Sequence, residues 1–499
     1  MRLNDIIENL PCTVTAGNTD RRLIPGDIRI DALSNDTRRI SENSLFFCIR
    51  GANFDSHDLA SEAAEKGAAA IVVQRDVQLP EGCEIPVVRV QDTRVAMARF
   101  AAAFYGHPAE KLRTIGVTGT KGKTTTTYLI RQMLENAGYE TGLIGTIEIV
   151  IGDEHIPADN TTPESLTLQE MMRRMVDAGC AAVVMEVSSQ ALMLHRTDGF
   201  TFDVGVFTNL EADHIGPNEH RDFADYLHCK SLLFKQCRTG IANVDDSHFK
   251  EVMEGHTCEL ITFGFSKGAD YRGAEPMLIR KPGELGVVFQ ISGRLDMRAE
   301  FRMPGQFSAY NALCAVAVAR FFDCDELQIE DALRRVRVSG RVEMIPVSDT
   351  FTLLIDYAHN AMALESLLVT LREYRPNRLI TLFGCGGNRS KDRRYRMGEV
   401  SGKLSDLTVV TSDNPRNEDP MAIIRDIEEG LARTTGEYVE IPDRREAIRY
   451  CIEHGEPGDI IVLAGKGHEL YQEIQGTKYP MDERVLIREI LTELEHERG

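Results

Sequence analysis

Residues 114–138 read TIGVTGTKGKTTTTYLIRQMLENAG, and this stretch decides the fold class. The apolar run 114–117 is typical of a buried strand, and the glycine-rich segment after it breaks regular structure. Apolar residues then recur at helical spacing, at Leu129, Ile130, Met133, Leu134 and Ala137. The pattern ends at Gly138, a common stop residue. The stretch therefore predicts a strand, a loop and a helix, which together are a building unit of α/β folds.

The glycine loop carries the residues of a nucleotide site. Backbone N–H groups and the positive end of the helix dipole favour phosphate there. Lys123 can reach the β- and γ-phosphates of ATP, and the Thr124 hydroxyl can bind Mg²⁺. The strict GxxxxGK[ST] spacing is not met, because position 117 is valine, and an ordinary glycine turn is the alternative. We place ATP at Gly119, Thr120, Lys121, Gly122, Lys123, Thr124 and Thr125.

Apolar runs of strand length alternate with amphipathic segments along most of the chain. The runs are 68–73, 114–117, 181–187, 204–210, 352–357, 379–384 and 459–465. This alternation predicts an α/β fold with mainly parallel sheets. Polar, glycine-containing breaks at 104–112 and 335–346 divide the 499 residues into three expected domains, 1–108, 109–338 and 339–499.

The composition excludes several classes of protein. The formal net charge of −20 argues against binding to nucleic acid and to anionic membranes. The 11 cysteines form no CxxC pair, so we expect reduced packing residues rather than a disulfide frame or zinc site. Residues 1–10 lack the pattern of a signal peptide, and no apolar run reaches membrane-spanning length. These features predict a cytoplasmic protein, which we expect to be a monomer.

Two further polar residues follow predicted strands. Glu186 ends the run 181–187, and His214 follows the run 204–210. Open α/β sheets place ligand contacts at the carboxyl ends of their strands. Glu186 and His214 therefore could meet Thr124 in one crevice and form a Mg–nucleotide site, although a lone histidine is more often structural.

At this point the chain resembles the Mur ligase family, ATP-dependent amide ligases of cell-wall synthesis. The resemblance covers nearly the whole chain and is carried by a series of motifs in order. They are IGVTGTKGKTT (115–125), NTTPES (160–165), MEVSSQAL (185–192), HR (195–196), FTNLEADHIG (207–216), GRVE (340–343), DYAHN (356–360), FGCGGNR (383–389), DNPR (413–416) and AGKGHE (464–469).

The resemblance implies a fold and a reaction. The first domain would hold the UDP end of the substrate, the central P-loop domain would bind ATP, and the Rossmann-like last domain would carry the incoming amino acid. Within the family the motifs resemble the branch that extends UDP-N-acetylmuramoyl-L-alanyl-D-glutamate at its third peptide position with meso-2,6-diaminopimelate. ATP would phosphorylate a carboxylate, and the amine would then displace phosphate from the acyl phosphate.

The same resemblance assigns residues to catalysis and to ATP. Lys123 would offset charge on the γ-phosphate, Thr124 and Glu186 would hold one Mg²⁺, and His214 would help to hold a second. Lys230 matches the lysine that the family carbamylates, whereas from sequence alone it reads as a helix-surface lysine. Further nucleotide contacts are implied at Asn311, Arg341, Asp356 and His359.

The muramoyl dipeptide is expected to contact polar side chains of the first two domains. Thr37, with Arg38, is the candidate in the first domain. Hydroxyl, amide and guanidinium groups suit the pyrophosphate, sugar and peptide. The stronger candidates are Asn160, Thr161, Thr162, Ser189, Gln190 and Arg196.

The segment Asp413-Asn414-Pro415-Arg416 follows the apolar run 407–410. A surface turn with a solvated arginine is the simple interpretation. The resemblance instead implies that Arg416 and Asn414 meet the distal carboxylate of diaminopimelate, with Gly465 and Glu469 at the same centre and Arg394 as another carboxylate contact. L-Lysine lacks that carboxylate and would leave Arg416 unpaired in a closed cleft, which can cost about 2–5 kcal/mol.

Other functions stay open from the sequence. The same ligase using L-lysine is the first alternative, and a folylpolyglutamate-synthase-like ligase is the second, although NTTPES and DNPR argue against it. A P-loop ATPase that acts as a binding or regulatory module without ligation is an alternative of a different class.

Overall fold

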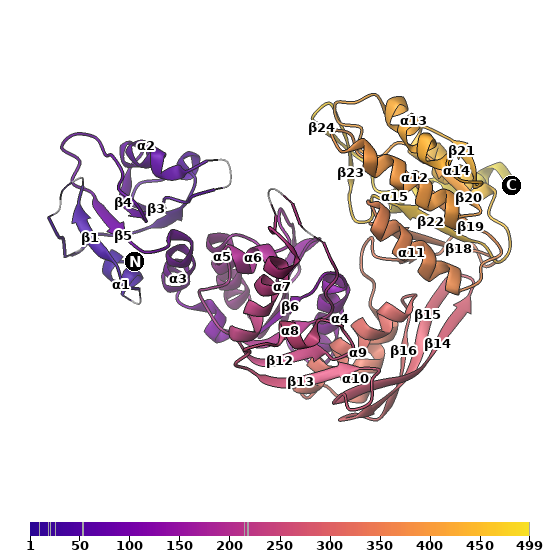
Figure 1. The fold of residues 1–499 in the computed structure, drawn as a ribbon, viewed down its shortest axis with the longest axis horizontal. Coiled ribbons are helices and arrows are strands. Elements are labelled where there is room, and N and C mark those ends of the chain that lie inside the picture. The colour runs from indigo at the N-terminus through magenta and orange to yellow at the C-terminus, as the bar shows by residue number, and fades with distance from the viewer. Residues whose placement is uncertain are drawn as a thin grey trace. The chain divides into compact units, whose positions relative to one another are not determined.

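The computed structural model describes residues 1–499 apart from 9, 18, 20, 25, 52–53, 214, 217–218 and 499. His214, a predicted metal ligand, lies outside the described residues. The chain divides into two compact units, which Figure 1 shows as ribbons. Unit 1 contains residues 1–271 and 314–328, and unit 2 contains residues 272–313 and 329–499. The three-domain division stays a prediction.

Unit 1 begins with a small sheet. Its strands run in the order β1 (Thr13–Ala16), β5 (Pro86–Arg89), β4 (Ala68–Val73), β3 (Ser44–Phe47) and β2 (Ala32–Ser34). They are parallel except for β1, which runs antiparallel to β5. The helices are α1 (Leu3–Ile7), α2 (Ala60–Glu65) and α3 (Thr93–Phe104), with short 3-10 turns at Thr37–Arg39, Ser56–Leu59 and Pro108–Lys111. Apolar clusters on this sheet give the first 104 residues a core of their own.

A larger sheet forms the centre of unit 1. Its strands run in the order β13 (Glu259–Gly264), β12 (Cys237–Asn243), β11 (Phe202–Phe207), β6 (Arg113–Thr118), β10 (Ala182–Glu186), β7 (Thr141–Ile144), β8 (Glu148–Ile151) and β9 (Glu154–Pro157). From β13 to β7 the neighbours are parallel, and β8 and β9 add an antiparallel edge. This arrangement confirms the predicted α/β class with a mainly parallel sheet.

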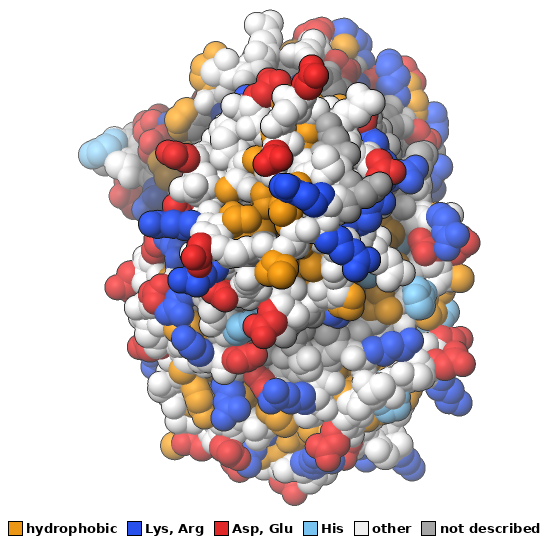
Figure 2. Space-filling view, turned by 90° about the vertical axis from the view of Figure 1, so that its left-hand side faces the viewer, with side chains coloured by type: hydrophobic (Ala, Val, Ile, Leu, Met, Phe, Trp, Pro, Cys, Tyr) orange, Lys and Arg blue, Asp and Glu red, His pale blue; other side chains and the backbone are white. Residues whose placement is uncertain are grey.

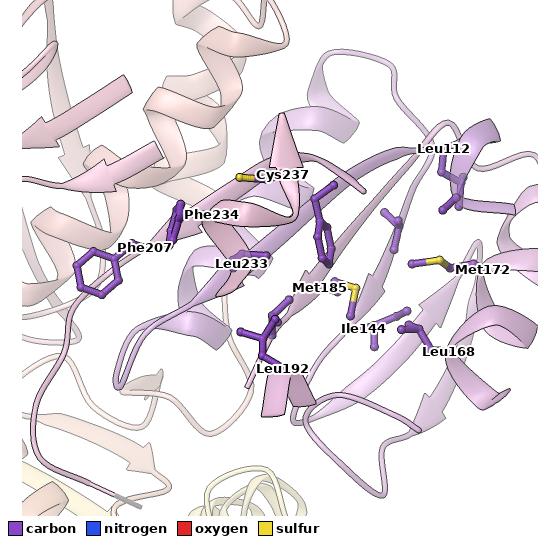
Figure 3. Packing of buried hydrophobic residues seen from close by; sticks show 14 of the residues in the cluster. Leu112, Ile144, Leu168, Met172, Met185, Leu192, Phe207, Leu233, Phe234 and Cys237 are labelled. Carbon is purple, nitrogen blue, oxygen red and sulfur yellow. The ribbon is translucent and has the colours of Figure 1, made fainter. Parts of the chain in front are cut away.

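Helices cover both faces of the central sheet. One face packs against α5 (Ser165–Asp177), α6 (Ser189–Met193), α7 (Phe223–Ser231) and α8 (Phe249–Val252), with a 3-10 turn at Leu232–Lys235. Figure 3 shows Leu168 and Met172 of α5 and Leu192 of α6 packed around Ile144 and Met185 of the sheet. The helix α4 (Lys123–Asn136) packs against β7 and β10. This strand, loop and helix match the prediction from residues 114–138.

The order of the strands places the site. The chain leaves β6, forms α4 and returns as β7 on the far side of β10, whereas β11 lies on the other side of β6. Connections therefore diverge at β6 and β10, and such a switch point leaves a crevice beyond the carboxyl ends of the strands. The glycine loop follows β6, and Glu186 is the last residue of β10.

Unit 2 contains a second α/β sheet. Its strands run in the order β17 (Glu343–Ile345), β18 (Thr352–Asp356), β22 (Ile460–Ala464), β19 (Leu379–Phe383), β20 (Leu407–Val410) and β21 (Glu437–Glu440). All are parallel except β17. The helices are α11 (Ala361–Glu373), α12 (Lys391–Leu404), α13 (Pro420–Leu431), α14 (Arg444–Glu453) and α15 (Glu483–Arg498), labelled in Figure 1. α14 and α15 supply the main apolar cluster on the sheet.

The remaining elements of the described residues are five further strands and two helices. The strands are β14 (Tyr271–Lys281), β15 (Glu284–Gly293) and β16 (Met297–Phe301), and the hairpin β23 (Tyr471–Ile474) and β24 (Thr477–Pro480). The chain passes between the units within β14, within α9 (Gln306–Phe321) and within α10 (Glu326–Arg335). Among the described residues no helix has the length and apolar character needed to cross a bilayer.

The distribution of charged side chains on one face and the state of the cysteines can be compared with what the composition predicts. On the face drawn in Figure 2, basic and acidic side chains are interspersed, so charge of one sign does not gather over the described residues of that face. The cysteines are free thiols, and most of them are buried, as expected for packing residues.

Candidate active site

The glycine loop after β6 has a shape that only glycine permits at its first position. Gly119 has a φ of +151°, and a Cβ there would lie 1.9 Å from Thr208 Oγ1. Lys123 Nζ donates to the carbonyls of Gly119 (2.9 Å) and Thr120 (3.1 Å), so the ammonium lies over the loop. Lys123 is the first residue of α4, at the positive end of the helix dipole. The loop therefore combines a cation with a helix N-terminus, which suits a phosphate.

The Glu186 carboxylate, at the end of β10, accepts three hydrogen bonds from Thr124 and Thr146. Thr124 Oγ1 donates to Glu186 Oε1 over 3.0 Å, and the Thr146 N–H donates to the same oxygen over 2.8 Å. Thr146 Oγ1 donates to Oε2 over 3.0 Å. The Glu186 side chain is buried, so these bonds compensate the desolvation of its carboxylate. Thr124 and Glu186, predicted from distant segments, are thus brought into contact.

The donor set fits magnesium. A threonine hydroxyl and a carboxylate 3.0 Å apart are hard oxygen donors, which Mg²⁺ prefers to nitrogen or sulfur. The second ion assigned through His214 is not tested, because that residue is outside the described part of the chain.

Lys230 is buried, which contradicts its interpretation as a helix-surface lysine. Its Nζ donates to the Gly119 carbonyl over 2.9 Å and lies 4.6 Å from the ring centroid of Tyr226. The residue is only 1% exposed. Burial, with Lys123 as a second cause, lowers the pKa of Lys230 well below the ordinary lysine value. A neutral amine at this position is the form that can react with CO₂, so the predicted carbamylation has a suitable environment.

A polar cavity of about 180 Å³ lies beside the glycine loop. We call it the polar cavity; its lining comprises Lys123, Asn160, Thr161, Thr162, Ser188, Ser189, Gln190, Arg196, Glu219 and His220. It contains six of the predicted dipeptide residues, which lie on three separate segments of the chain. Thr37 lies in the 3-10 turn Thr37–Arg39 after β2 and is not part of this lining.

Arg196 is fixed in the wall of the polar cavity. Its Nη1 donates to the Thr162 carbonyl over 2.8 Å, and its Nη2 lies 2.6 Å from Glu164 Oε1. Thr162 Oγ1 in turn donates to the Glu186 carbonyl over 2.8 Å. The polar cavity and the Thr124–Glu186 pair are therefore joined by hydrogen bonds.

The residues assigned to the nucleotide in unit 2 are described within that unit. Asp356 accepts the N–H groups of Val342 and Ala358, both over 2.8 Å. Burial raises the pKa of Asp356, and the nearby Arg341 opposes this shift. The Arg341 guanidinium lies 5.0 Å from the Tyr357 ring centroid, and the His359 ring lies 4.7 Å from the same ring. Arg341, Asp356 and His359 therefore form one cluster.

Asn311 lies in α9 and is buried. Its Nδ2 has no hydrogen-bond partner among the described residues. A buried amide donor normally has an acceptor, so this group is consistent with the predicted contact to adenine.

Arg416 has a built-in counter-ion, which the sequence did not reveal. Its Nε lies 3.0 Å from Glu473 Oε2, and its Nη1 donates to the Gly387 carbonyl over 2.8 Å. Nη2 makes no hydrogen bond within the described part of the chain, and the side chain is 24% exposed. The expectation that L-lysine would leave Arg416 unpaired is therefore wrong for this structure, because Glu473 already neutralises it.

The backbone holds Arg416 in an uncommon conformation. Its φ is +52°, and its N–H and carbonyl pair with Glu473 and Gln475 of the hairpin that follows β22. Gly387 lies close behind, since a Cβ there would lie 1.9 Å from the Pro415 carbonyl oxygen. The guanidinium is thus aimed by the turn at Pro415 and by the hairpin together.

Asn414 and Glu469 are linked through a buried lysine. Lys466 Nζ donates to Asn414 Oδ1 (3.0 Å) and Glu469 Oε2 (2.9 Å), and Asn414 Nδ2 donates to Glu469 Oε2 (2.8 Å). Gly465 has a φ of +107°, and a Cβ there would lie 3.0 Å from Asp413 Oδ2. The segments 413–416 and 465–469 therefore lie against each other, and their role as one substrate site stays a prediction.

Arg394 is engaged with carboxylates of the protein itself. Nη1 and Nη2 each lie 2.8 Å from a different oxygen of Glu418, and Nη1 lies 2.9 Å from Asp426 Oδ2. The side chain is 1% exposed. In this structure Arg394 anchors the loop that follows Arg416, and its contact with a bound amino acid stays a prediction.

Sequence reasoning missed several residues that shape these sites. Thr146 follows β7 at the same edge as Glu186, so its position after an apolar run was an available signal. Lys466 lies within the AGKGHE motif and is buried, but no signal in the sequence distinguished it from a surface lysine. Glu473 lies on a strand without an apolar pattern, and no sequence signal linked it to Arg416.

The fold and the site define a class of protein: a P-loop α/β unit joined to a second α/β unit with a charged site. Family models match three parts of the chain, the Mur ligase family catalytic domain at 29–105, the Mur ligase middle domain at 117–319, and the Mur ligase glutamate ligase domain at 340–467.

Curated relatives match at full length. UDP-N-acetylmuramoyl-L-alanyl-D-glutamate–2,6-diaminopimelate ligase of Caldanaerobacter subterraneus is 41% identical over 99% of this chain and 100% of that protein. The protein of the same name from Geobacillus thermodenitrificans is 40% identical over 99% of this chain and 100% of that protein. The chain belongs to the Mur ligase family.

Solved structures agree with this placement. A structure of a UDP-N-acetylmuramoyl-L-alanyl-D-glutamate–2,6-diaminopimelate ligase superimposes with a TM-score of 0.68 and 27% identity, over 94% of this chain and 96% of that one. MurF ligase from Thermotoga maritima in complex with ADP gives a TM-score of 0.58 at 17% identity, over 94% and 98% of the two chains, and supports the fold alone.

Proposed function

We propose that the chain is an ATP-dependent ligase that adds meso-2,6-diaminopimelate to UDP-N-acetylmuramoyl-L-alanyl-D-glutamate, in the synthesis of peptidoglycan precursor. The observation that carries this proposal is the joint presence of two sites. The first is the loop with Lys123, Thr124 and Glu186 beside the polar cavity. The second is the Arg416 site of unit 2.

The residues of unit 1 support phosphorylation of a carboxylate. Lys123 and the loop N–H groups would bind the phosphates of ATP, and Arg196 and Ser189 would hold the peptide end of the muramoyl dipeptide. Thr124 and Glu186 would hold Mg²⁺, which when bound neutralises phosphate charge. Such catalysis consists mainly of positioning and electrostatic stabilisation, which preorganised buried groups provide.

Lys230 has a proposed role as a carbamate. Attack of the neutral Lys230 amine on CO₂ forms an N–C bond and releases one proton. The resulting anion at the Gly119 loop would be a further oxygen donor close to Lys123, where a cationic lysine could not bind a metal.

Unit 2 supports selection of a diamino diacid. Nη2 of Arg416 and the exposed part of its guanidinium would receive the distal carboxylate of diaminopimelate. Glu469 would pair with the ammonium at the same centre. Because Glu473 already offsets Arg416, discrimination against L-lysine is expected to depend on the gain of a charge-assisted hydrogen bond, about 1.5–3 kcal/mol, rather than on an unpaired charge.

A phosphate-release assay with each substrate omitted in turn tests the proposal. Release that requires ATP, the muramoyl dipeptide and diaminopimelate together supports it, and mass spectrometry should detect the UDP-muramoyl tripeptide. Release with ATP alone at the same rate would instead indicate a non-ligating ATPase. Equal rates with L-lysine in place of diaminopimelate would contradict the choice of amino acid.

A further inference from the structure

Three side chains form a connected series behind the polar cavity. The Nε2 atom of His220 lies 2.8 Å from Ser189 Oγ, and Nδ1 lies 3.4 Å from Asp225 Oδ2. His220 is 1% exposed, and its ring packs on Tyr226 with centroids 5.1 Å apart. Nε2 is therefore hydrogen-bonded to Ser189, Nδ1 has a carboxylate at ion-pair distance, and one face of the ring packs on Tyr226.

The two neighbouring serines at the start of α6 have different tasks. Ser188 is the N-cap, and its hydroxyl accepts the Ala191 N–H over 3.1 Å. Ser189 is the first helical residue, and its hydroxyl lies against His220. Helix capping therefore explains Ser188 but not the contact between Ser189 and a buried histidine.

Asp225 is well placed to hold the far side of the ring. It lies in the first turn of α7, and the Arg221 N–H donates to its Oδ2 over 3.2 Å. A carboxylate near Nδ1 favours the tautomer with the proton on Nδ1, which leaves Nε2 to accept from the Ser189 hydroxyl. The orientation of the Ser189 hydroxyl then follows from the ring.

The place where this series ends is functional in the proposed reaction. Ser189 and His220 both line the polar cavity, together with the cationic groups of Lys123 and Arg196. A hydroxyl that donates to Nε2 keeps oxygen lone pairs that can accept from an amide N–H. The peptide end of the muramoyl dipeptide offers such N–H groups.

We propose that His220 is a positioning residue of the ligase reaction. With Asp225 behind it, His220 holds the Ser189 hydroxyl in the wall of the polar cavity, where the hydroxyl contacts the peptide end of the muramoyl dipeptide. The inference rests on the proposed function, which supplies the ligand of this cavity. His220 itself acts through Ser189.

A double-mutant cycle tests this inference. His220→Phe keeps a ring against Tyr226 and removes both polar contacts, and Ser189→Ala removes the hydroxyl. Each change is expected to raise the KM for UDP-N-acetylmuramoyl-L-alanyl-D-glutamate about tenfold and to leave the KM for ATP within about twofold. The KM of the double variant for the dipeptide should be no higher than that of the more strongly affected single variant, because both changes remove the same interaction.

A conservative variant and a matched control separate positioning from packing. His220→Gln can place an amide oxygen near the position of Nε2, as an acceptor for the Ser189 hydroxyl, and should recover most of the affinity for the dipeptide. His248→Phe changes a half-buried histidine whose ring packs on Phe223 of the same helix α7, outside the lining of the polar cavity. This control should leave both KM values unchanged.

Several results would overturn the inference. Additive effects of the two changes on the KM for the dipeptide would do so. Equal increases in the KM for ATP and in the KM for the dipeptide would also do so. If His220→Phe does not fold, judged by thermal unfolding, the cycle is run with Asp225→Asn and Ser189→Ala under the same criteria. A wild-type protein without any ligation would contradict the proposed function instead, so the two failures are distinguishable.

Discussion

At the scale of single residues, Lys230 shows how burial prepares a side chain for chemistry. The amine lies against the Gly119 carbonyl and beside the Tyr226 ring, with almost no contact to solvent. Because the pKa of Lys230 is lowered in the folded state, the unfolded chain binds a proton that the folded chain does not. Lys230 therefore lowers the free energy of unfolding at pH values below the ordinary lysine pKa. This penalty becomes smaller as the pH rises toward that pKa.

The unfavourable burial of the Lys230 amine leads to two predictions for Lys230→Met, one for thermal stability and one for the ligase rate. In CO₂-free buffer at neutral pH, the variant should unfold at a higher temperature than the wild type, because a buried amine is replaced by an apolar chain. Its ligase rate should fall by about a hundredfold or more, since a preorganised catalytic group is lost. Thermal unfolding at several pH values and phosphate release measure the two effects. Lys235→Met, an exposed change in the following turn, should alter neither.

Intact-mass measurement examines the carbamate itself. Wild-type protein in bicarbonate buffer should carry the mass of one CO₂ at Lys230, and acid should remove it. A ligand-bound crystal structure with an unmodified ammonium at Lys230 would contradict the assignment.

Arg416→Ala should raise the KM for diaminopimelate and leave the KM for ATP nearly unchanged. Loss of a charge-assisted hydrogen bond to the distal carboxylate is expected to raise the KM for diaminopimelate about ten- to a hundredfold. The KM for ATP should stay within about twofold, because Arg416 has no assigned contact to the nucleotide. Steady-state kinetics with each substrate varied tests this, and Arg425→Ala, an exposed change on α13, is the control. Similar increases for both substrates would point to general damage of unit 2.

At the scale of elements, the hairpin β23–β24 supplies the carboxylate that pairs with the Arg416 guanidinium. Glu473 is on β23, and the backbone of the hairpin pairs with Arg416. Glu473→Gln removes the counter-ion, so diaminopimelate would restore a charge pair that L-lysine cannot. The ratio of kcat/KM for diaminopimelate over lysine should therefore rise about tenfold.

The same variant can contradict this reasoning. If Glu473 serves only to aim the guanidinium, Glu473→Gln should lower the preference for diaminopimelate and raise its KM. Glu437→Gln, an exposed change on β21, should leave the ratio unchanged.

Elements also show which features a sequence can predict. Strand β6, the loop and helix α4 followed from apolar spacing and glycine positions, because these are local properties. The burial of Lys230 did not, since its contact with Gly119 joins residues 111 positions apart. The role of Glu473 was hidden because β23 and β24 are short strands without a periodic apolar pattern.

At the scale of the whole molecule, ligand binding should be visible as stability. A ligand that binds only the folded state at a hundred times its Kd adds about 2.7 kcal/mol. Mg-ATP should therefore raise the temperature of the unfolding transition of the wild type. Lys123→Ala should lose this shift, because the phosphates lose their cation, whereas Lys111→Ala, an exposed change before β6, should retain it. An equal shift in Lys123→Ala would place the nucleotide elsewhere.

The most direct test of the central claim is a competition between meso-diaminopimelate and L-lysine at equal concentration, with ATP, Mg²⁺ and the muramoyl dipeptide present. Mass spectrometry of the UDP-muramoyl tripeptides gives the ratio of the two kcat/KM values. The account predicts an excess of the diaminopimelate product of about tenfold or more. Equal amounts of the two products, or an excess of the lysine product, would contradict it.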